Sequence, residues 1–134
     1  MSFLINIDVP DIEAGERFYT EALGLRVGRR FDSSFLELLG GPAPIYLLGA
    51  PSGTPAAATL ATTPRNYDRH WCPVHLDFVV PDIGAALERA VKAGATVEVP
   101  LAEHVYGKLA VLADPFGHGF CLLEFRGRGY DELT

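Results

Sequence analysis

The sequence is poor in cysteine, has no excess of positive charge and contains no long apolar run. No secretion signal precedes its two cysteines, Cys72 and Cys121, so we expect a reduced, cytoplasmic protein without a structural disulfide. No apolar run approaches the roughly 18 residues that a membrane span needs, so we expect no membrane partner. The 11 basic and 17 acidic residues give a formal charge of −6, whereas nucleic-acid binding requires a basic face. The sequence also shows no phosphate-binding loop, no CxxC pair and no Ser/His/Asp set.

The sequence does have a repeated junction between a strand and a helix. Apolar residues occupy every second position from Val74 to Val80, and this period of two is typical of a strand. Pro81 ends the strand because it cannot donate a ladder hydrogen bond, and Asp82 is a favourable helix N-cap. The tetrapeptide Val-Pro-Asp-Ile of this junction, at 80–83, also occurs 71 residues earlier, at 9–12. Internal duplication is therefore the main feature of the chain.

Each copy of the junction precedes an amphipathic pattern and a glycine that can end a helix, Gly24 or Gly94. Helices are expected at about 11–23 and 83–93, and strands at 3–9, 25–31, 34–39, 43–48, 74–80, 95–99, 108–113 and 120–125. The pattern predicts an α+β fold of two β-α-β-β-β modules in tandem. The boundaries are module one at 3–49, a linker arm at 50–72, module two at 73–126 and a frayed polar tail at 127–134.

The arm is long for a compact domain, and its second half carries the only tryptophan, Trp71. We consider two interpretations: this half closes over a ligand as a lid, or it packs its aromatic residues on the neighbouring module.

The two modules, the Val-Pro-Asp-Ile junctions and Asp-Pro-Phe-Gly at 114–117 together resemble the vicinal oxygen chelate superfamily. That group includes glyoxalase I, extradiol dioxygenases and the bleomycin and fosfomycin resistance proteins. The segment Phe-Tyr-Thr-Glu-Ala-Leu-Gly-Leu at 18–25 is similar to the family's first helix and its exit. The resemblance covers residues 3–126. It implies that each sheet curls into a half-cup, that paired modules close a cavity, and that the protein is a homodimer.

The resemblance also implies which positions would hold a metal, since metal-binding members carry His or Glu ligands on the first and last strands of each module. Two of these positions follow from the motifs, because His75 precedes Asp82 by seven residues and Cys121 follows Asp114 by seven. The four residues found at these positions are Leu4, Tyr46, His75 and Cys121.

This set is a poor site for a divalent metal. Leu4 cannot ligate, and one imidazole with one thiol could hold zinc only with further ligands. We therefore expect no cofactor and no metal. If a divalent metal bound, its ligands would be His75 with Cys121 or Glu124, although strand alternation points Glu124 to the face opposite Cys121.

These observations predict a protein with a degraded metal site that binds a small aromatic or amphipathic molecule in its cup. One alternative is a metal-dependent lyase, isomerase or dioxygenase of the same superfamily. Others are a metal-free catalyst with His75 as general base, and a scaffolding domain whose own side chains fill the cup. No catalytic residue is assigned. The expected ligand-binding residues are His75, Tyr46, Cys121, Asp77, Leu4, Phe35 and Tyr106.

Overall fold

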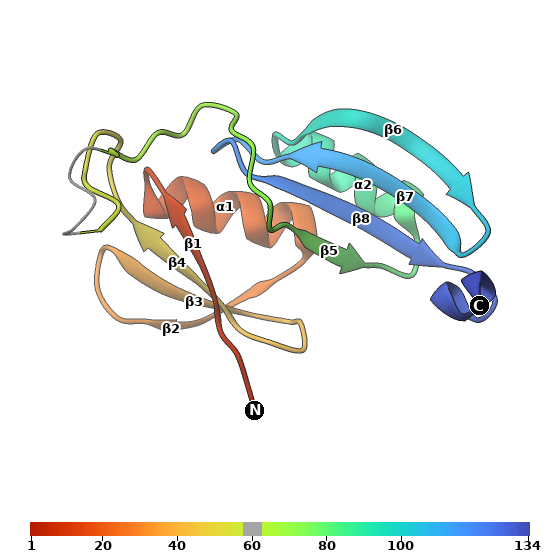
Figure 1. The fold of residues 1–134 in the computed structure, drawn as a ribbon. Coiled ribbons are helices and arrows are strands. Elements are labelled where there is room, and N and C mark those ends of the chain that lie inside the picture. Colours follow the sequence, from red (N-terminus) through yellow and green to blue (C-terminus); the bar gives the residue numbers. More distant parts are fainter. Residues whose placement is uncertain (58–62) are drawn as a thin grey trace. The chain divides into compact units, whose positions relative to one another are not determined.

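The computed structural model describes residues 1–57 and 63–134 of the chain. It divides into two compact units, Met1–Asp68 and Arg69–Thr134. The described part of each unit has a four-stranded sheet with an α-helix against one face (Figure 1). Of the predicted arm at 50–72, residues 58–62 lie outside the described residues.

The first unit has the predicted β-α-β-β-β order. The Asp11 side chain accepts a hydrogen bond from the backbone N–H of Ala14 at 2.7 Å, and Gly24 ends the helix in the left-handed region at φ 68°. In the sheet order β1-β4-β3-β2, β1 runs parallel to β4, and the other pairs are antiparallel. The elements are β1 (Ile5–Val9), α1 (Ile12–Leu23), β2 (Arg26–Arg30), β3 (Phe35–Leu39) and β4 (Ile45–Gly49).

The second unit repeats this topology with the sheet order β5-β8-β7-β6. Asp82 caps its helix by accepting from the N–H of Ala85 at 2.9 Å, and Gly94 ends it at φ 115°. Both predicted N-caps and both predicted ends are therefore confirmed. The elements are β5 (Leu76–Val79), α2 (Ile83–Ala93), β6 (Thr96–His104), β7 (Gly107–Ala113), β8 (Gly119–Phe125) and the 3-10 helix η1 (Gly129–Leu133).

One face of each sheet packs on its helix because every second strand residue is apolar. In the first unit, α1 lies so close to the sheet that a Cβ on Gly15 would be 3.0 Å from Val9 and 3.1 Å from Leu47. In the second unit, Leu112 and Leu122 are fully buried on the face that meets α2. Each such leucine contributes about 1.5–3 kcal/mol, so these helix-covered faces are the cores that hold the two sheets in shape.

The structure corrects several predicted boundaries. β6 is longer than the predicted strand at 95–99, because two register irregularities let it follow β7 as far as His104. β5 is shorter than predicted because its pairing with β8 begins at Leu76, so His75 lies just before the strand. The tail was expected to be frayed, which is wrong: it forms η1, and Tyr130 packs on Phe125 with ring centroids 4.9 Å apart.

The described part of the arm in the first unit folds back on itself and on β1. Arg65 pairs with Asp8 of β1, with an Nε–Oδ2 distance of 2.5 Å, and the hydroxyl of Tyr67 donates to the carbonyl of Ala50 at 2.6 Å. The backbone N–H of Arg65 also donates to Thr54, at 2.8 Å. These bonds attach the arm to its own unit. Within the described residues, no helix combines the length and apolarity that crossing a membrane requires.

Candidate functional site

In the second unit, three predicted residues meet on the face of the sheet that points away from α2. His75, just before β5, and Asp77, within it, are two positions apart, so their side chains leave the same face. Cys121 on β8 is the register partner of Asp77. The parallel pairing of β5 and β8 therefore brings together residues that are more than 40 positions apart in the sequence.

The three side chains form a compact polar group. His75 Nε2 lies 3.1 Å from Asp77 Oδ1. One potential ligand atom from each of the three residues lies within 4.8 Å of the other two. Cys121 is only 6% exposed, and burial together with the nearby Asp77 carboxylate raises the pKa of its thiol to about 12. Cys121 is therefore a neutral thiol at physiological pH and not a reactive thiolate.

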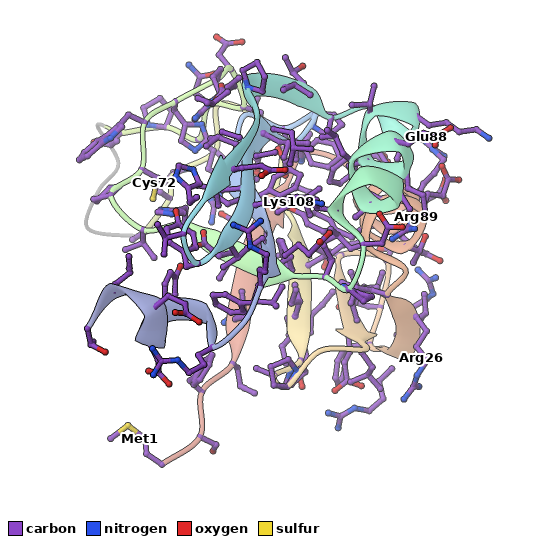
Figure 2. The ribbon with its side chains drawn as sticks, turned by 90° about the vertical axis from the view of Figure 1, so that its right-hand side faces the viewer. Met1, Arg26, Cys72, Glu88, Arg89 and Lys108 are labelled. Carbon is purple, nitrogen blue, oxygen red and sulfur yellow. The ribbon has the colours of Figure 1, made fainter. Side chains whose placement is uncertain are left out.

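A pocket of about 230 Å³ opens beside this group. Trp71, 82% exposed, and Cys72 lie on its wall and precede β5 in the chain. Figure 2 shows Cys72 on the side of the second sheet away from α2, whereas Glu88 and Arg89 project from that helix. The full lining is Arg69, Trp71, Cys72, His75, Val111, Gly119, Phe120 and Cys121.

Tyr106 lies outside this lining, in an aromatic group at the turn between β6 and β7. Its ring stacks on His104 with centroids 5.0 Å apart, and its other neighbour is Tyr130 of η1 at 5.1 Å. Burial and the Asp77 carboxylate raise the pKa of Tyr130, which places its hydroxyl in the field of the polar group. The sequence analysis does not include Tyr130 in the site because it predicts a frayed tail at 127–134. The signal that could have identified Tyr130 is that it is the one aromatic residue in the polar segment 127–134.

In the first unit, Tyr46 belongs to a network that the sequence analysis did not foresee. Its hydroxyl donates to Glu37 Oε1 at 2.9 Å, and Arg29 Nη2 donates both to the same carboxylate oxygen at 2.6 Å and to the Tyr46 hydroxyl at 3.1 Å. Arg29 Nε donates to the other carboxylate oxygen at 3.0 Å. The side-chain bonds from Arg29 and then Tyr46 lower the pKa of Glu37 to about 2, although the residue is only 5% exposed.

Aromatic rings extend this network. Phe35 stacks on Tyr46 with centroids 5.3 Å apart, and Phe31 lies 4.8 Å from Phe35 and carries the Arg29 guanidinium over its ring at 5.3 Å. Glu37 could have been noticed in the sequence as the one charged residue of the strand Phe-Leu-Glu-Leu-Leu. Its partner Arg29 could not, because a bulge in β2 sets which side chain faces it.

The remaining predicted residues lie apart from these groups. Leu4 precedes β1 and is 60% exposed. Glu124 lies on the helix side of its sheet, as alternation predicted: its Oε2 accepts from the Ile83 N–H at 2.8 Å, and Oε1 lies 3.4 Å from Lys108 Nζ.

The four positions that resemblance implies for a metal do not carry the family's His/Glu set. Leu4 offers no donor atom, and the Tyr46 hydroxyl is engaged by Glu37 and Arg29. These four residues therefore do not fit the open metal centre of the metal-binding members.

Known proteins share both the sequence pattern and the fold. An anthracycline biosynthesis protein of Streptomyces peucetius, DnrV, is 35% identical over 120 residues, which are 89% of this chain and 39% of that protein. The curated relatives that the chain matches are longer proteins, and it spans between 30% and 39% of their length.

Solved structures agree with this comparison. A glyoxalase/bleomycin resistance protein/dioxygenase family enzyme from Burkholderia phytofirmans matches with a TM-score of 0.72 and 24% identity, over 92% of this chain and 97% of that one. The fosfomycin resistance protein FosX from Listeria monocytogenes matches with a TM-score of 0.72 and 14% identity, over 100% and 98%. These likenesses concern the fold. The family model described as a glyoxalase-like domain matches residues 4–123, and the chain therefore belongs to this family, within the vicinal oxygen chelate superfamily.

Proposed function

We propose that this protein binds a small planar aromatic molecule non-covalently, with one ring edge in the pocket beside Trp71 and His75. The observation that carries this proposal is the pocket itself. It joins an exposed indole, a half-exposed imidazole and the apolar side chain of Val111. Ligand sites are typically of this kind, mostly apolar with a few polar groups that orient the ligand.

The size of the pocket limits what it can hold. An engineered cavity of about 150 Å³ accommodates one benzene molecule. The pocket of about 230 Å³ therefore suits one or two fused rings, and a larger ligand would extend beyond it. Trp71 supplies a stacking surface, and His75 supplies a donor or acceptor at its edge.

A run of aromatic side chains in the first unit also favours an aromatic ligand. Phe31, Phe35 and Tyr46 form a run of aromatic rings, and Phe31 is 48% exposed. The Arg29–Glu37 ion pair and the Arg29 guanidinium over Phe31 hold one end of this run, so its rings are pre-organised. The relative DnrV is named for anthracycline biosynthesis, and anthracyclines are fused-ring aromatic compounds.

The test is a titration of metal-free protein with naphthalene-2-sulfonate, whose two fused rings match the pocket. Binding is followed by thermal shift for every variant, and also by Trp71 fluorescence for those that keep this one tryptophan. Stacking on one aromatic side chain contributes about 1–3 kcal/mol, so Trp71→Ala should weaken binding roughly 5- to 150-fold. His75→Ala removes one hydrogen bond of about 0.5–1.5 kcal/mol and should weaken it roughly 2- to 12-fold.

Glu88→Ala is the matched control, because Glu88 projects from α2 on the other side of the sheet (Figure 2). It should bind the probe like the wild type. Equal binding by the wild type and by both pocket variants would show that the pocket is not the site.

A further inference from the structure

We propose that the second unit holds a subsite for an organic ammonium group, formed by the Asp77 carboxylate and the rings of Tyr106 and Tyr130. This inference rests on the proposed function and deepens it, because it names the ligand class as a planar aromatic amine. The ring of such a ligand occupies the pocket beside Trp71, and its ammonium group projects past Cys121 toward Asp77. Neither tyrosine lines the pocket, so the subsite extends the binding site beyond it.

The Asp77 carboxylate has room for a cationic partner. Its side chain is 35% exposed, and within the part of the chain that the structure describes its one ion-pair contact is with the His75 imidazole, between Oδ1 and Nε2 at 3.1 Å. A carboxylate has about four acceptor sites, so this contact leaves capacity for an ammonium group. Burial and then the Asp77 carboxylate raise the pKa values of the Cys121 thiol and the Tyr130 hydroxyl. Two separate groups therefore lie in the negative field of Asp77, and this field attracts a cation.

The two tyrosine rings form a wall beside this carboxylate. Gly127 and Gly129, at φ 58° and 63°, turn the chain back after β8, so that η1 lies next to the turn between β6 and β7 (Figure 1). A Cβ on Gly129 would be 3.1 Å from the Phe125 ring, so the tail lies directly on β8. The ring centroids of Tyr130 and Tyr106 are 5.1 Å apart, and Tyr130 is 50% exposed. An ammonium group over the face of such a ring is attracted by its π electrons.

Strand alternation puts the wall and the carboxylate on the same face of the sheet. Cys121 is the register partner of Asp77, and Phe125 lies further along β8 at the same parity, so these side chains leave the face away from α2. Tyr130 packs on Phe125 with ring centroids 4.9 Å apart. The subsite is therefore continuous with the pocket, which Cys121 also lines.

The arginines of the pocket and of the tail do not neutralise Asp77. Each of them has another carboxylate as its partner, and among the described residues no lysine or arginine pairs with Asp77. The net charge of −6 also favours the approach of a cation. The arginine pairs are Arg69 with Glu98 at 2.9 Å, Arg126 with Glu103 at 3.8 Å and Arg128 with Glu132 at 3.5 Å.

The test compares two probes of similar shape and opposite charge, 2-naphthylmethylammonium and the naphthalene-2-sulfonate used above, by isothermal titration calorimetry. The wild type should bind the ammonium probe at least about tenfold more tightly, which is the lower end of what a hydrogen bond to a charged group contributes. Asp77→Asn keeps the shape of the side chain and removes its charge, so the ratio of the two Kd values should fall toward one. A general loss of folded protein weakens both probes and does not change this ratio.

The wall is tested by Tyr130→Ala, which should weaken binding of the ammonium probe roughly 2- to 5-fold, whereas Tyr130→Phe keeps the ring and should bind nearly like the wild type. Leu133→Ala is the matched control, because Leu133 is an exposed residue of the same 3-10 helix, and it should bind both probes like the wild type. If the wild type binds both probes equally or prefers the sulfonate, or if Asp77→Asn keeps the preference, the ammonium subsite is wrong and the proposed function stands. If neither probe binds, the proposed function is wrong and this inference fails with it.

Discussion

The absence of a side chain at Gly28 makes room for the Glu37 carboxylate, and this leads to a sharp prediction for Gly28→Ala. An added Cβ would lie 2.5 Å from Glu37 Oε2 and 2.9 Å from Leu39 Cδ1, well inside the contact distance of about 3.5 Å. The carboxylate must therefore move by about 1 Å, which breaks its 3.1 Å hydrogen bond from the Arg29 N–H. Overpacking of this kind costs roughly 1–3 kcal/mol, and we expect Tm to fall by roughly 3–12 °C.

Two controls isolate the cause. Gly84→Ala adds the same methyl group on α2, where the nearest atom is 3.4 Å away, and it should leave stability unchanged or raise it. On a Glu37→Ala background the clash at residue 28 is relieved, so Gly28→Ala should cost much less there, and urea denaturation of the four proteins forms a double-mutant cycle. If Gly28→Ala destabilises both backgrounds equally, the carboxylate is not what requires glycine at this position.

Three more predictions follow from the same structure. The pKa of Glu37 falls from 4.5 to about 2 on folding, so its stabilising effect is present above pH 4.5 and disappears as the pH falls toward 2. The stability difference between the wild type and Glu37→Gln, measured by urea denaturation, should shrink over this window, and a difference independent of pH would contradict the assignment. Iodoacetamide should label Cys72, which is exposed, and spare Cys121, which is buried, so two thiols reacting at one rate in mass spectrometry would be evidence against the packing of β8. We expect a homodimer, and light scattering at micromolar concentration tests this against a monomeric mass.

The sequence predicted the fold well because its strongest signals are local. Val-Pro-Asp-Ile combines a strand end, a proline stop and a cap, and each of these acts within a few residues. The helices therefore begin at Ile12 and Ile83 as expected. Boundaries that depend on a partner strand were less accurate. β6 extends to His104 only because β7 continues beside it, and nothing within 96–104 encodes that length.

In the candidate site, too, features with a local sequence signal were predicted better than features that depend on tertiary packing. Strand parity placed His75 and Asp77 on one face, and the resemblance to the superfamily implied that Cys121, seven residues after Asp114, belongs to the same site. The neighbours that define its chemistry were predicted less well, because a place for Trp71 beside a ligand was only one of two interpretations of the arm, and Tyr130 was missed. Trp71 reaches the pocket from an irregular segment, and Tyr130 reaches the field of Asp77 from the tail. Both depend on tertiary packing, for which the sequence carries no periodic signal.

The parallel pairing within each sheet has a consequence for how the chain folds. Ile5 pairs with Ile45, and Leu76 pairs with Phe120. The first strand of each unit therefore cannot pair until the last strand of that unit is in place. Closing such long loops lowers the conformational entropy of the chain before the strand contacts form and stabilise it, and this slows folding. During synthesis, β5 would leave the ribosome with its hydrogen-bonding edge unpaired until β8 follows. A chain shortened before Gly119 would keep α2 but expose both that edge and the apolar face beneath it, and we expect it to aggregate.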